Sequence, residues 1–99
     1  FLDYDPAPAL QRLDVPVLAI FGELDTQVPA EANKEAMMGA LEKGSNQDYT
    51  VEVLPEANHL FQKAVTGGPD EYPDLKKEFV PGLLDLMTDW ILARVRVAE

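Results

Sequence analysis

The chain of 99 residues contains no cysteine, a single histidine and a single serine. Without cysteine there can be no disulfide framework and no thiolate metal site. His59 has no second histidine at metal-ligand spacing, so a zinc site is not expected either. Because many secreted proteins also lack cysteine, its absence leaves the cellular location open.

Positive charge is also scarce. Lys and Arg number 8 against 18 Asp and Glu, which gives a formal net charge of −10. Nucleic-acid binding needs clustered Lys and Arg, and an acidic chain is repelled by anionic membrane surfaces. No apolar run approaches the roughly 20 residues that cross a bilayer. We therefore expect neither a nucleic-acid partner nor a membrane partner.

The composition is that of a globular protein, with 46% hydrophobic and 26% charged residues. At this length the chain is expected to form one small domain over residues 1–99. Its first residue, Phe1, is not a natural start, so we expect an interior start with further sequence upstream. A domain this short buries only a modest share of its surface.

Hydrophobic patterning predicts one βαβ unit with two parallel strands, followed by a long helix. The predicted elements are a short helix within residues 5–13, a strand over 16–22, a helix over 29–44, a strand over 49–54, a loop over 63–74 and a helix over 81–95. The first strand is continuously apolar, as expected for a strand covered on both faces of a parallel sheet. The fold class is therefore expected to be α/β.

Each long predicted helix carries an apolar stripe at helical spacing. The stripe of the first contains Ala32, Ala36, Met37, Ala40 and Leu41, and that of the last contains Leu83, Leu84, Met87, Trp90, Ile91 and Val95. We expect the two helices to cover opposite faces of the sheet, with the stripes buried against it. A partner-binding surface on the last helix is the alternative interpretation of its stripe.

The residues with catalytic potential follow the two predicted strands. Asp25 comes after the first strand and His59 after the second. Neighbouring parallel strands end at the same edge of a sheet, which brings the two residues together. An exposed imidazole with a carboxylate on its other nitrogen can act as a general base. Asp25 could instead be a turn residue and His59 an ordinary hydrogen-bonded side chain, and Glu23 is a second candidate for the acid.

Three segments resemble the carboxy-terminal third of an α/β-hydrolase domain. Residues 15–29 (VPVLAIFGELDTQVP) resemble the strand and acid loop of these enzymes, residues 58–62 (NHLFQ) their histidine loop, and residues 81–95 their final helix. The closest similarity is to serine esterases, dienelactone hydrolases and prolyl-oligopeptidase-like enzymes. The resemblance implies that Asp25 is the acid and His59 the base of a catalytic triad. It also implies a small-molecule ester or acyl substrate, and no metal or organic cofactor.

The nucleophile of such a triad is missing. No Gly-x-Ser-x-Gly motif is present, and Ser45 lies in a polar connector at the opposite end of the strands from the predicted site. In these enzymes the chain order is Ser, acid, His, so the nucleophile is expected upstream of Phe1. The resemblance thus implies the acid- and base-bearing fragment of a serine hydrolase, inactive alone.

The alternative interpretation is a non-catalytic module, derived from the same fold, that associates with itself or binds a partner. Without a preceding strand, the first strand would leave backbone N–H and C=O groups unpaired on its outer edge. We therefore expect homo-oligomers, formed by pairing of this edge or by exchange of the last helix.

Overall fold

The computed structural model describes residues 6–95, so both ends of the predicted domain 1–99 and the first residue of the predicted short helix lie outside it. The elements in chain order are α1 (Ala7–Gln11), β1 (Val17–Gly22), α2 (Ala30–Lys43), β2 (Tyr49–Leu54), the 3-10 helix η1 (Pro69–Asp74) and α3 (Leu83–Arg94). The two strands pair in parallel, from Val17 with Tyr49 to Gly22 with Leu54. The predicted α/β class with one βαβ unit is confirmed.

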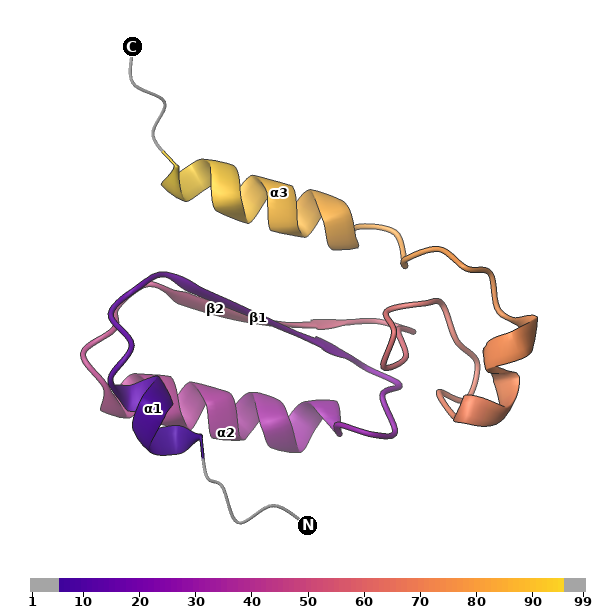
Figure 1. The fold of residues 1–99 in the computed structure, drawn as a ribbon, viewed down its shortest axis with the longest axis horizontal. Helices are drawn as coiled ribbons and strands as arrows, with labels where there is room; N and C mark the ends of the chain where they lie inside the picture. The colour runs from indigo at the N-terminus through magenta and orange to yellow at the C-terminus, as the bar shows by residue number, and fades with distance from the viewer. Residues whose placement is uncertain (1–5, 96–99) are drawn as a thin grey trace.

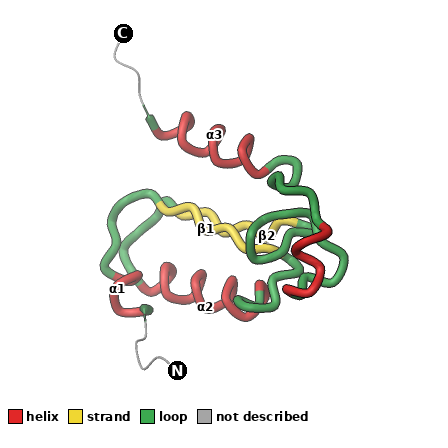
Figure 2. The backbone as a smooth tube through the Cα atoms, turned by 45° about the vertical axis from the view of Figure 1, so that its right-hand side comes forward, coloured by secondary structure: helices red, strands yellow, loops and turns green. Residues whose placement is uncertain are grey.

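The two long helices lie on opposite sides of the sheet, as predicted (Figures 1 and 2). The crossover helix α2 packs against both strands and against α1. On the other face, the Trp90 indole N–H of α3 donates to the Thr50 hydroxyl at 3.1 Å. The Arg94 guanidinium also binds the Asp48 carboxylate, with its closest contact at 2.7 Å. These polar contacts fasten α3 to the start of β2.

Two predicted boundaries need correction. Residues 63–74 are not all loop, because η1 forms over the last six of them and has Pro69 in its first turn. Helix α3 begins at Leu83 and not at residue 81, since Gly82 has a φ of 93° and lies in the left-handed region. A left-handed residue cannot belong to a right-handed helix, so the helix starts after it.

The predicted burial of the α3 stripe is wrong for most of its members. Only Leu83 is buried, whereas Leu84, Met87, Ile91 and Val95 are exposed by 59%, 39%, 46% and 56%. The side of α3 that faces the sheet passes through Leu83 and Trp90, and a sheet of two strands is too narrow to cover the wider stripe. The structure therefore leaves an apolar band on this helix open to solvent.

The stripe predicted for α2 is also narrower in the structure. Ala40 and Leu41 are buried and Met37 is half-buried, but Ala32 and Ala36 are exposed. Ala30, at the start of the helix, takes part in the buried face instead. The two exposed alanines lie beside the face that packs on the sheet. At such positions the sequence pattern alone does not show whether a residue contacts the sheet or is exposed.

A small hydrophobic core lies at the carboxyl end of the sheet. Ala57, Val80 and Leu83 form it, and Ile20 and Phe61 pack against it. The backbone also joins these segments, because the Val80 N–H donates to the Phe61 carbonyl at 2.7 Å. This core fixes the loop after β2 to the segment before α3, and that loop contains the only histidine.

The helices of residues 6–95 include none with the length and apolar character needed to cross a membrane.

Candidate active site

The acid loop, residues 23–28, begins where β1 ends. The Asp25 N–H donates to the Gly22 carbonyl at 3.1 Å, which closes a tight turn. One carboxylate oxygen, Oδ1, accepts hydrogen bonds from the backbone N–H groups of Gln27 and Val28, both at 2.8 Å. Such an Asx turn orients the carboxylate by its own backbone and leaves Oδ2 for another partner.

These contacts also set the ionisation of Asp25. Burial acts to raise the pKa of the carboxyl group, but the hydrogen bonds from Val28, His59 and Gln27 outweigh it and hold the pKa below its usual value. Hydrogen bonds to a carboxylate favour its charged form. At neutral pH the side chain is therefore an anion that can only accept hydrogen bonds.

The histidine loop, residues 55–62, is organised by Asn58. This side chain is fully buried, and its Oδ1 accepts the N–H groups of Leu60 and Gln62, each at 2.9 Å. The Phe61 N–H donates to the Asn58 carbonyl at 3.0 Å, with Phe61 itself at a φ of 60°. Sequence reasoning noted Asn58 only as a neighbour of His59. The preference of Asn for turns that bond its own backbone is the signal that could have indicated this role.

The two loops continue the parallel pairing beyond the strands. The Glu23 N–H donates to the Leu54 carbonyl at 2.9 Å, and the Leu24 N–H to the Ala57 carbonyl at 2.8 Å. Gly22 allows this approach, because a Cβ there would lie 2.5 Å from the Asn58 carbonyl oxygen. Any larger residue at the end of β1 would push the histidine loop away from the acid loop.

The structure separates the two candidate acids. Glu23 is exposed, and its carboxylate accepts the backbone N–H of Glu56 at 2.8 Å. It therefore connects the two loops and does not contact the imidazole. Asp25 Oδ2 lies 2.9 Å from His59 Nδ1.

The pairing of Asp25 with His59 fixes the roles of the two imidazole nitrogens. Because the ionised carboxylate cannot donate, Nδ1 must carry the proton that is shared with Oδ2. The neutral ring then has its lone pair on Nε2. The Asp25 side chain is only 8% exposed and that of His59 is 38% exposed. The acid is thus shielded while the imidazole remains accessible to a reactant.

Ser45 does not belong to this arrangement. It follows α2 and precedes β2, at the amino end of the strands, whereas Asp25 and His59 follow their carboxyl ends. Six residues of strand span about 20 Å, which separates this serine from the imidazole. Among residues 6–95, no group of three or more Asp, Glu or His side chains could hold a metal ion.

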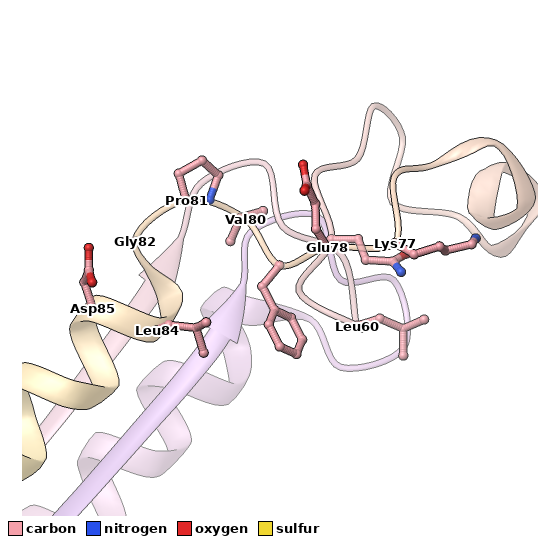
Figure 3. Close-up of a pocket in the computed structure, with 10 residues that line it drawn as sticks. Leu60, Lys77, Glu78, Val80, Pro81, Gly82, Leu84 and Asp85 are labelled. Atoms are coloured by element: carbon pink, nitrogen blue, oxygen red, sulfur yellow. The ribbon is translucent and has the colours of Figure 1, made fainter.

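An open cavity of about 470 Å³ lies beside the histidine loop (Figure 3). Leu60, which follows His59 in the chain, lines one side, and Leu84 at the start of α3 lines the other (Figure 3). Phe79 and Val80 contribute further apolar surface, and the charged residues Lys77, Glu78 and Asp85 also line the cavity. Sequence reasoning did not find this cavity, because its walls come from segments that only tertiary packing brings together.

Comparison with known proteins agrees with this geometry. The model of the prolyl oligopeptidase family matches residues 1–80. A curated protein of Yersinia pestis with the name "Putative carboxymethylenebutenolidase" is 34% identical over 90 residues, which are 91% of this chain and 31% of that protein. The chain thus spans about a third of the length of this relative, at 31%. No solved structure gives a significant match.

The family match covers β1, β2, the acid loop and the histidine loop, which are the elements that build the site. The expected resemblance to α/β-hydrolases is confirmed by both comparisons. The chain therefore belongs to the prolyl oligopeptidase family, within the α/β-hydrolase superfamily.

Proposed function

We propose that Asp25 and His59 are the acid and the general base of a serine hydrolase that cleaves ester or related acyl bonds. The observation that carries this proposal is the 2.9 Å hydrogen bond between Asp25 Oδ2 and His59 Nδ1, with the imidazole exposed. Membership of a hydrolase family supports it. In a triad, the carboxylate selects the tautomer of the imidazole and stabilises the imidazolium that forms during the reaction.

In the proposed reaction, a serine Oγ attacks the carbonyl carbon of the substrate and its proton passes to His59 Nε2. The imidazolium then donates this proton to the leaving group, and water completes the cycle by the same route. Asp25 stays ionised throughout. Because Ser45 is the only serine in these 99 residues and lies at the far end of the sheet, the proposal requires a nucleophile from outside them.

Esters are the substrate class that we propose first. The name of the Yersinia pestis relative refers to a butenolide, which is a cyclic ester. The mostly apolar cavity beside Leu60 would suit the non-reacting part of a small uncharged ester. The chemistry described here needs only side chains, so the proposal includes no metal and no organic cofactor.

A hybrid protein tests the proposal, because the proposed nucleophile would come from the part of a relative that this chain does not match. In the hybrid, this chain replaces the matching segment of the Yersinia pestis relative, and hydrolysis of a p-nitrophenyl ester is measured. We expect turnover that falls by about 10³-fold or more in His59→Ala and in Asp25→Asn. Glu23→Gln is the matched control and should keep turnover, because glutamine can still accept the Glu56 N–H. Full activity in Asp25→Asn, with the fold intact by circular dichroism, would refute the proposal.

The chain alone provides the second half of the test. We expect it to hydrolyse the same ester no faster than an equal concentration of imidazole, since the proposal takes both the nucleophile and the oxyanion hole from outside these residues. Turnover above that level that disappears in His59→Ala would contradict the proposed division of roles. The alternative function, a non-catalytic module, is favoured only by the lack of a nucleophile motif in the sequence, and an inactive but folded hybrid would support it.

A further inference from the structure

Glu71 in η1 gathers three successive backbone N–H groups of the loop after the histidine loop. Its carboxylate accepts hydrogen bonds from Val65 at 3.0 Å, Thr66 at 3.1 Å and Gly67 at 3.0 Å. The hydrogen bond from the Thr66 N–H contributes most to holding the pKa of Glu71 below its usual value, whereas burial acts to raise that pKa. The ionised carboxylate thus fixes the backbone conformation of residues 65–67.

Gly67 is the point at which this loop contacts the acid loop. It is buried and has a φ of 85°, and a Cβ at this position would collide with the Leu24 carbonyl oxygen. The Thr26 hydroxyl donates to the Gly67 carbonyl at 3.3 Å. Gly67 therefore contacts the residues on both sides of Asp25.

A second contact joins the same two segments. The Gln27 side-chain amide donates to the Tyr72 hydroxyl at 3.3 Å, and Tyr72 follows Glu71 directly in η1. The Gln27 backbone N–H is one of the two that bind Asp25 Oδ1. Residues 65–72 thus support the acid loop at positions 24, 26 and 27, around the carboxylate.

We propose that Glu71 is a positioning residue for the Asp25–His59 pair, and that it acts by holding Gly67 against the acid loop. A role confined to its own loop would require only the contacts with residues 65–67. The contact of Gly67 with Leu24 and Thr26 extends the effect to Asp25. The catalytic part of this inference rests on the proposed function, whereas the structural part does not.

The test is the pKa of Asp25, measured in the chain by the ¹³C shift of its carboxyl carbon during a pH titration. Loss of the support in Glu71→Ala lets the acid loop relax and weakens the hydrogen bonds to Asp25, so the pKa of Asp25 should rise. Removal of a negative charge alone would lower that pKa, because a nearby anion disfavours ionisation. The two explanations therefore predict shifts of opposite sign.

Asp70→Ala is the matched control. Asp70 is the exposed neighbour of Glu71 in η1, and its side chain forms no hydrogen bond or ion pair with the described residues. The Asp70→Ala substitution should lower the pKa of Asp25 slightly or leave it unchanged. Glu71→Gln keeps one oxygen that can accept an N–H, so its effect should lie between those of the wild type and Glu71→Ala. An Asp25 pKa in Glu71→Ala equal to that in Asp70→Ala would overturn the inference.

Two further changes test the same path, and Thr26→Val is the milder of them if Glu71→Ala fails to fold. Thr26→Val removes the hydroxyl that binds Gly67 and should also raise the pKa of Asp25. Gly67→Ala should do so through the collision with Leu24, whereas Gly68→Ala should not, because a Cβ there meets only the Thr66 hydroxyl at 3.6 Å. An unchanged pKa in both Thr26→Val and Gly67→Ala would refute the inference.

In the active hybrid, Glu71→Ala should lower kcat more than it changes KM, since the positioned pair acts in the chemical step. Asp70→Ala should leave both values unchanged. If the hybrid is inactive, the proposed function fails, but the titration of Asp25 still decides whether Glu71 positions the acid loop.

Discussion

The two carboxylate oxygens of Asp25 have different partners. Oδ1 accepts two backbone N–H groups of its own loop, and Oδ2 faces His59 Nδ1. The backbone contacts set the direction of the carboxylate, so the imidazole need not do so. A short self-contained turn can therefore deliver the acid to the edge of a very small sheet.

This arrangement predicts a loss of stability in acid. The pKa of Asp25 is lower in the folded chain than in the unfolded chain. Its contribution to folding is therefore complete above the ordinary pKa of an aspartate, about 3.9, and is lost as the pH falls through the lowered folded value. Urea unfolding at decreasing pH should show this loss. The loss of stability should be smaller in Asp25→Asn, whereas Asp70→Asn should retain the full loss. An identical acid dependence in Asp25→Asn and the wild type would contradict the prediction.

At this scale, sequence reasoning identified the two residues whose positions depend on the strands. Asp25 and His59 each follow a strand, and the ends of parallel strands coincide. Glu71 was not recognised, because its role depends on a loop that folds back on the acid loop. No local pattern in residues 65–72 encodes that contact, although Gly67 indicated a turn.

Among the elements, the end of β1 has a tight steric constraint beside the acid and the imidazole. The histidine loop crosses so close to Gly22 that a Cβ there would meet two backbone carbonyl oxygens, those of Asn58 at 2.5 Å and Ala57 at 2.6 Å. Backbone atoms cannot move aside as a flexible side chain can. The short distance between acid and imidazole therefore depends on the absence of a side chain at this position.

A pair of glycine substitutions tests this constraint. Gly22→Ala should destabilise the chain by about 1–3 kcal/mol, the usual cost of overpacking. Gly39→Ala should instead stabilise it by about 0.5–1 kcal/mol, because this position lies inside α2 with no atom within 4 Å of the new Cβ. Both values come from urea unfolding. Equal effects of the two substitutions would show that the close approach at Gly22 has no energetic importance.

The order and type of the long elements followed from hydrophobic patterning, and β2 has its predicted bounds. The burial of α3 did not follow, because periodicity shows which residues share a face but not how much of that face a neighbour covers. Leu84 and Ile91 share the apolar stripe with Leu83, yet the two-stranded sheet reaches only Leu83 and the side of Trp90.

For the whole molecule, the main consequence of a two-stranded sheet is an unpaired outer edge on β1 within the described residues. The N–H groups of Val17 and Glu23 donate toward β2, to Asp48 and Leu54. Because successive residues of a strand alternate, the N–H groups of Leu18 and Ile20 point away from β2. An apolar strand with free donors readily pairs with another chain.

We therefore propose that a second copy of the chain pairs with this edge of β1. Light scattering at micromolar concentration should give a mass above that of the monomer. Leu18→Pro removes an outward N–H without breaking the pairing of β1 with β2, so it should reduce the associated fraction. A monomer at all concentrations would count against edge pairing, and association unaffected by Leu18→Pro would point to exchange of α3 instead.

The proposed chemistry depends on the hydrogen bond that His59 Nδ1–H donates to the Asp25 carboxylate, which leaves the lone pair of Nε2 free to act as a base. The most direct measurement is the ¹⁵N spectrum of the imidazole at a pH where the ring is neutral. The signals need no assignment to a residue, because His59 is the only histidine. We expect Nδ1 to be protonated and Nε2 unprotonated in the wild type, and this preference to be lost in Asp25→Asn. A proton on Nε2 in the wild-type chain would show that Asp25 does not select the tautomer required of a general base.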